Sequence, residues 1–140
     1  TGSLNFAHLP KLKKLGEAVF TDNASLTAVN FPLLEEIGDV CFSGGANFSG
    51  NGLKITYVSI PAAKKIGSGA FHGNYKHPGV TFILGAQPEV NTKAYEDYPQ
   101  EGFVAFGQLK DPILYVTPAN KATYQITDGK WKNFTVKELK

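Results

Sequence analysis

The stretch "NFPLLEEIGDVCF", residues 30–42, is the middle one of three copies of a single pattern. The copy before it is "HLPKLKKLGEAVF", residues 8–20, and the copy after it is "SIPAAKKIGSGAF", residues 59–71. Each copy has a proline, a glycine six residues later and a phenylalanine four residues after that. With successive prolines 22 and then 29 residues apart, this self-similarity predicts a repeat architecture.

A short apolar segment, typical of a β-strand, precedes each proline. Proline cannot donate to a strand ladder, so it suits the place where the strand ends, and the glycine suits a second corner. No single unit can bury its apolar side, so we expect the units to stack as a parallel β-solenoid with equivalent side chains in columns. The columns expected to be buried contain Leu26, Val29, Phe31, Ile37, Phe42, Ile55, Val58, Ile60, Ile66 and Phe71, with Phe42 near Phe20 and Phe71 and with Leu26 near Ile55.

A fourth, degenerate unit follows if Gly85 is set in the position of the proline. Phe82 and Leu84 then take the apolar sites that precede the corner. Terminal units of repeat arrays commonly depart from the consensus. We therefore expect about four coils of short parallel strands over residues 1–95 and a long loop with a C-terminal capping module over residues 96–140, all in one continuous domain.

The expected capping module contains little helix. Residues 96–112 lack helical or strand periodicity and are typical of a long loop. Residues 113–116, "ILYV", are apolar and β-branched enough for one more strand. Thr117 suits an N-cap and Pro118 the first helical position of a short helix that runs through about Tyr124.

The consensus L-x-x-V-x-F-P-x-L-x-x-I-G-x-x-x-F resembles the BspA-type leucine-rich repeat over residues 4–139. The ending "LYVTPANKATYQITDGKWKNF", residues 114–134, resembles the degenerate terminal module of such arrays. Insertions at residues 43–52 and 72–79 break the even period of the family. The resemblance implies a leucine-rich-repeat solenoid and a bacterial secreted or cell-surface protein. It also implies a non-enzymatic adhesion or protein-interaction module that binds a host or cell-surface protein outside the cell.

Charged pairs alternate in sign from one unit to the next. Lys13 and Lys14 are followed by Glu35 and Glu36, and then by a further pair of lysines, within a chain of net charge +2. Because a nucleic-acid surface would repeat one sign, we expect a solvated ladder of ion pairs and no nucleic-acid partner. No apolar run is long enough to cross a bilayer, so we expect no membrane insertion of this segment.

Residues that could support catalysis are scarce. Cys41 falls on the small apolar site before the phenylalanine, which predicts a buried structural thiol rather than a nucleophile. His72 and His77 are spaced without a third ligand for a metal. The glycines of "GSGAF", residues 67–71, align with a corner of the other copies rather than with a phosphate loop. We therefore expect no enzyme, no cofactor and no metal site.

Binding has more support, because side chains alternate along each strand. If the residues three and one before each corner point inward, those four and two before it point to solvent. Aromatic and small polar residues on a rigid platform are typical of recognition surfaces, although they could also be sheet formers on an open face. The two expected rows are Phe6, Ala28, Tyr57 and Thr81, and beside them His8, Asn30, Ser59 and Ile83.

Four loops follow the same position of each unit, so we expect them on one edge, where insertions often build a binding surface. Their aromatic residues would suit a protein or a carbohydrate, or would pack the loops themselves. A structural spacer or display scaffold is the remaining alternative. The loops are residues 21–25, 43–52, 72–79 and 96–112, with Phe48, Tyr75, Tyr98, Phe103 and Phe106, and the partner-binding candidates of both surfaces are Phe6, His8, Asn30, Tyr57, Ser59, Tyr75, Tyr98 and Phe103.

The first unit has no preceding cap, so the strand around Leu4 to Leu9 should present an unpaired edge. Thr1 opens directly into a repeat without a signal peptide, and we expect further sequence upstream of it. The edge would then be covered by upstream repeats, or it would pair with a second copy in edge-mediated self-association.

Overall fold

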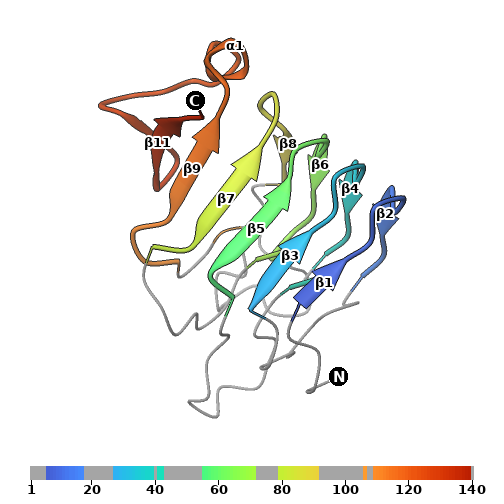
Figure 1. Ribbon diagram of the computed structural model, residues 1–140. Coiled ribbons are helices and arrows are strands. Elements are labelled where there is room, and N and C mark those ends of the chain that lie inside the picture. Colours follow the sequence, from blue (N-terminus) through green and yellow to red (C-terminus); the bar gives the residue numbers. More distant parts are fainter. Residues whose placement is uncertain are drawn as a thin grey trace.

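The repeat copies build two sheets of mostly parallel strands in the computed structural model, which describes residues 6–17, 27–39, 41–42, 55–71, 79–91, 106 and 109–139. Among these residues the larger sheet has seven strands (Figure 1). All of its pairings are parallel except the last, where the final two strands form an antiparallel hairpin. In sheet order the strands are β1 (Phe6–His8), β3 (Ala28–Asn30), β5 (Tyr57–Ile60), β7 (Thr81–Leu84), β9 (Ile113–Val116), β11 (Phe134–Glu138) and β10 (Lys130–Trp131).

A second, wholly parallel sheet lies behind the first, and each of its four described strands has two residues (Figure 1). The chain therefore alternates between the sheets, and each repeat unit contributes one strand to each. We number these units one to four in chain order. The strands of the second sheet are β2 (Lys14–Leu15), β4 (Glu36–Ile37), β6 (Lys65–Ile66) and β8 (Glu89–Val90), in that order across the sheet.

The pairing between strands matches the repeat alignment. Val29 pairs with Val58, and Val58 pairs with Phe82, so equivalent positions of units two, three and four lie side by side. In the smaller sheet, Ile37 pairs with Ile66 in the same way. The parallel register predicted from the prolines is confirmed, including that of the degenerate fourth unit.

Close contact between backbones explains the glycine at the second corner. The Gly38 N–H donates to the Leu15 carbonyl at 2.9 Å, and the Gly67 N–H donates to the Ile37 carbonyl at 2.9 Å. A Cβ on Gly38 would collide with the backbone carbonyl group of Gly16. Units two and three therefore require the absence of a side chain at this corner.

Aromatic rings fill the space between the sheets. Phe42 and Phe71 stack with centroids 5.2 Å apart, and Phe71 meets Phe82 edge to face at 4.9 Å. The predicted columns are confirmed wherever the structure describes them, while Leu26 and Phe20 lie outside the described residues. The confirmed members are Val29, Phe31, Ile37, Phe42, Ile55, Val58, Ile60, Ile66 and Phe71, all at most 3% exposed.

A short helix, α1 (Pro118–Lys121), begins the cap at the far end of the sheets (Figure 1). As predicted, Thr117 is its N-cap, and its hydroxyl accepts from the Asn120 N–H at 3.2 Å. The prediction that the helix continues to about Tyr124 is wrong. After Lys121 the backbone tightens into a turn, which lets the Tyr124 side chain enter the core and donate its hydroxyl to the Gly85 carbonyl at 2.9 Å.

Among the described residues, α1 is the only α-helix, and it has four residues. The described fold is therefore mainly β. Within the described part of the chain, no helix combines the length and the apolar character needed to cross a membrane.

Candidate interaction surface

The outer face of the larger sheet, turned away from the smaller one, displays alternate side chains of each strand. In β5, Val58 and Ile60 are fully buried between the sheets, while Tyr57 is 36% exposed. The predicted alternation is complete in β7, where Thr81 and Ile83 are half-buried, and it is interrupted in β5 by Ser59. The sheet therefore offers two outward rows of side chains, held at the spacing of neighbouring strands.

The first row runs through the residues four positions before each corner. Strand pairing places Phe6 beside Ala28, Ala28 beside Tyr57, and Tyr57 beside Thr81. Ala28 and Thr81 are half-buried, and Tyr57 is the large exposed side chain of this row. The backbone of Phe6 takes its expected place in β1, whereas its side chain lies outside the described residues. The strands therefore pair in the register that the predicted row requires, with Tyr57 near the middle of the row.

The second row runs through His8, Asn30, Ser59 and Ile83, which pair in register. His8 is exposed, and its Nδ1 lies 3.1 Å from the Asn30 carbonyl oxygen. Asn30 and Ile83 are half-buried. The prediction that Ser59 faces solvent is wrong, because it is only 9% exposed. Ser59 pairs with Asn30 on one side and with Ile83 on the other, and both of these residues have larger side chains.

Both rows continue beyond the fourth unit onto the cap. Thr81 pairs with Ile113, and Ile83 pairs with Tyr115, so two residues of β9 extend the face. Ile113 and Tyr115 are half-buried, while Leu114 between them is fully buried. This extension was not predicted from the sequence, although "ILYV" alternates in the same way as the other strands, with its second and fourth residues at the inward positions.

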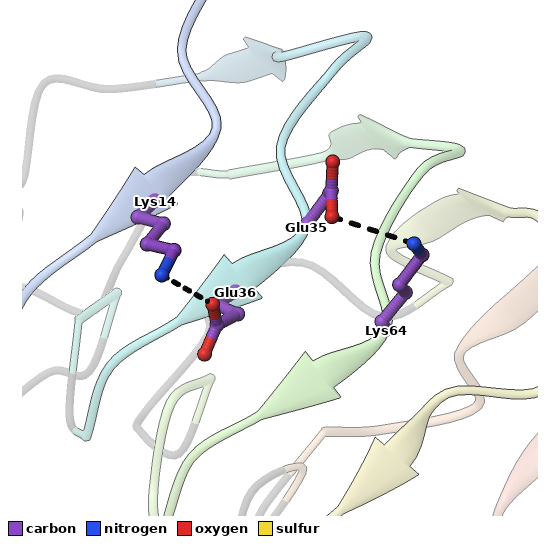
Figure 2. A network of polar contacts seen from close by, with 4 residues as sticks. All are labelled: Lys14, Glu35, Glu36 and Lys64. Carbon is purple, nitrogen blue, oxygen red and sulfur yellow. Dashed lines mark ion pairs between the residues drawn. The ribbon is translucent and has the colours of Figure 1, made fainter.

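The outer face of the smaller sheet carries the charge ladder (Figure 2). Lys14 Nζ lies 2.9 Å from a carboxylate oxygen of Glu36, and Lys64 Nζ lies 3.4 Å from one of Glu35. The hydrogen bond to Glu36 and its charge raise the pKa of Lys14, and Lys14 in turn lowers the pKa of Glu36. The predicted pairs between units are confirmed, and their high exposure makes them ordinary solvated ion pairs.

A groove of about 760 Å³ crosses the four strands of the smaller sheet. Its lining combines Lys14, Glu36, Lys65 and Glu89 with the glycines of the second corner. Because positive and negative side chains alternate along it, the groove favours neither sign of ligand.

The loop edge contributes little that the structure describes. Tyr75, Tyr98 and Phe103 lie outside the described residues, and so do Phe48, His72 and His77. Phe106 does not contribute to a binding surface on this edge, because its side chain is 6% exposed within the core, in line with the alternative that loop aromatic residues pack inward. Its ring stacks on Phe71 with centroids 5.8 Å apart and meets Phe134 edge to face at 4.9 Å. Phe106 therefore joins the repeat core to the cap, where its flat ring extends the stack.

The Cys41 side chain is fully buried, as predicted from its place in the repeat. Its position inside the core gives it no access to a substrate. It therefore adds nothing to the outer face of the larger sheet.

Comparisons of the chain with models of known protein families, with curated proteins and with solved structures gave no match. The outer face of the larger sheet is therefore the feature on which a function can be based. Its described centre consists of Tyr57, Thr81, Ile83, Ile113 and Tyr115 on three neighbouring strands.

Proposed function

We propose that this chain is a BspA-type leucine-rich-repeat solenoid that serves as a non-enzymatic interaction or adhesion module of a secreted or cell-surface protein. The in-register pairing of equivalent repeat positions in both sheets supports the solenoid. The family assignment and the location outside the cell rest on the resemblance of the repeat and of the ending. The partner is a protein, and the module binds it through the outer face of the larger sheet.

The observation that carries this proposal is the apolar and aromatic centre of that face. Tyr57 and Tyr115 flank β7, on which Thr81 and Ile83 lie between them. Tyrosine provides a large contact area at a small cost in side-chain entropy and is enriched at binding hot spots. Parallel sheets are usually covered on both faces, so half-buried Ile83, on a face that no described strand or helix covers, suits a surface that a partner completes.

A structural spacer is the second candidate, and the burial of side chains along the face favours it. Ser59 is buried, and among the described side chains of the two rows Tyr57 is the exposed large hydrophobic one. A spacer needs only a rigid stack, which the two sheets supply. Binding at the position of Tyr57 therefore distinguishes the two functions.

Photo-crosslinking from position 57 tests the proposal. A photoreactive phenylalanine analogue replaces Tyr57 in one variant and Leu33 in a matched variant, because Leu33 is also an exposed hydrophobic residue, at 46%, but lies on a corner. Crosslinking on host cells or on the producing cells should yield a defined protein from position 57 only. The purified partner should then bind Tyr57→Ala about tenfold or more weakly than it binds Leu33→Ala, as expected of a hot spot.

Three results would contradict the proposal. Equal crosslinking from both positions would indicate non-specific contact. Unchanged affinity of Tyr57→Ala for a captured partner would move the binding site to another face. Absence of any crosslinked protein on either kind of cell would favour the spacer.

A further inference from the structure

A second surface, the N-terminal end face, lies where unit one ends the stack. It comprises the outward edges of β1 and β2 together with Leu9, Lys11, Lys13, Lys14, Gly16 and Glu17 of unit one. The two strands stand at the ends of their sheets and have one neighbouring strand each among the described residues. Strand edges of this kind are available for pairing with another strand.

Leu9 departs from the residues at its equivalent position in the other units. It is 45% exposed, whereas Phe31 and Ile60 are fully buried and Leu84 is 2% exposed. Each of these three residues precedes the corner of a unit that has another unit on its N-terminal side. Leu9 thus has the side chain of a buried column without the cover that the same position receives elsewhere.

Gly16 shows the same contrast in the backbone. A Cβ on Gly38 would collide with Gly16, and a Cβ on Gly67 would stand 2.8 Å from the backbone of Gly38. A Cβ on Gly16 would meet no described atom within 4 Å. Within the described structure, nothing at Gly16 requires the absence of a side chain. If another unit stacked on unit one in the way that unit one stacks on unit two, its backbone would leave no room for a side chain at position 16.

The charges of the end face indicate what kind of unit fits there. Lys11, Lys13 and Lys14 are all exposed, and so is the acidic Glu17, which follows Gly16 beyond the end of β2. Figure 2 shows Lys14 reaching Glu36 and Lys64 reaching Glu35, so that acidic and basic units alternate. Lys13 makes no ion pair among the described residues. A unit stacked on this face would therefore fit best with acidic residues opposite Lys13 and Lys14.

These charges also argue against a second copy of the same end. If β2 of one copy paired with β2 of another, Lys13 and Lys14 at that strand would lie close to the same two lysines of the other copy. Like charges opposite each other on neighbouring strands are destabilising. The end face therefore suits a different, acidic segment better than it suits itself.

We propose that the N-terminal end face docks one further repeat unit, parallel and in register, whose acidic pair occupies the positions that Glu35 and Glu36 occupy in unit two. Its strands pair with β1 and β2, its apolar side chains cover Leu9, and its backbone packs against Gly16. This interface is separate from the outer face of the larger sheet and does not depend on what that face binds.

The chain itself supplies an acidic probe for this site. In the extended variant, a copy of residues 26–42 precedes Leu4 and is joined to it by a copy of residues 21–25, which keeps the spacing of the first two units. Docking should raise Tm by at least about 2–4 °C and slow amide hydrogen exchange in β1. The matched control carries lysines in place of both glutamates of the added copy, and its gain in Tm should be clearly smaller.

Gly16→Val provides a second test, which does not depend on how much the extension stabilises. The substitution should leave Tm of the original chain nearly unchanged, and it should lower Tm of the extended chain. Equal effects in the two chains would overturn the proposed contact at Gly16. Unchanged exchange in β1 of the extended chain would overturn docking, and equal stabilisation by the lysine control would overturn the acidic partner.

Sedimentation of the original chain tests the competing occupant. The proposal expects a monomer at concentrations where edge pairing would be visible. A dimer that Leu9→Glu dissociates would show that a second copy occupies the end face, and the proposal would be wrong.

Discussion

Phe42 and Phe71 stack face to face, with ring centroids 5.2 Å apart and ring planes 4° from parallel. The two residues occupy equivalent positions, at the end of the repeat pattern in units two and three, and both are fully buried. Replacing Phe42 by Ala would open a cavity between the two units. We expect this change to lower the free energy of unfolding by about 3–5 kcal/mol in urea titrations.

Leu33→Ala serves as the control for that measurement, because Leu33 is 46% exposed at the corner of the same unit. Its effect should stay within about 0.5 kcal/mol. Equal losses from both variants would contradict the stacked core.

Gly38→Ala should destabilise the protein, although replacing glycine by alanine usually lowers the backbone entropy that is lost on folding. The added methyl group would collide with the backbone of Gly16, so the two units would have to separate locally. We expect a loss of about 1–3 kcal/mol in the free energy of unfolding. Gly16→Ala is the matched control and should change it by less than about 0.5 kcal/mol, since no described atom lies near its added Cβ.

Cys41 should react slowly with thiol reagents in the native protein. It is fully buried, so the reagent gains access only when the surrounding core opens. If opening requires global unfolding, at about 5–15 kcal/mol, labelling should be about 10³-fold or more slower than in denaturant. Comparable rates in the two conditions would show that the core around Cys41 opens readily.

The Tyr124 hydroxyl should stabilise the contact between cap and repeats. It is buried, donates to the Gly85 carbonyl at 2.9 Å, and has its pKa raised by burial. Tyr124→Phe would leave that carbonyl without this donor, and we expect a loss of about 1–3 kcal/mol in the free energy of unfolding. Tyr57→Phe removes an exposed hydroxyl from the repeats and should be nearly neutral by the same measurement.

The ion pair of Lys14 and Glu36 should contribute a small, pH-dependent part of the stability. Lys14 lowers the pKa of Glu36 below its ordinary value of 4.5, so the contribution of this carboxylate is present above pH 4.5. It is lost as the pH falls through the lower pKa of the folded state. Glu36→Gln should therefore have a lower Tm than the unaltered protein near pH 7, and the difference should disappear in acid. A difference that persists in acid would exclude the ion pair as its cause.

The repeat register could be predicted because three copies place the same residue types at the same spacing. Val29 pairs with Val58, as alignment on the prolines requires, and Ile37 pairs with Ile66 in the smaller sheet. Side chains that recur at one position must share one environment when the units stack. The sequence by itself therefore determined the parallel pairing, the buried columns, the buried thiol of Cys41 and the alternation of charge.

Contacts between segments far apart in the chain were decided only by the tertiary structure. Ser59 is 9% exposed although its strand position predicts an outward side chain, and Phe106, from the expected loop, lies in the core with its ring stacked on Phe71. Tyr115 extends the candidate surface because β9 pairs with β7 in a register that no repeat position specifies. Period and residue type specify which way a side chain points. How deeply it is buried depends on the size of the side chains that folding places beside it.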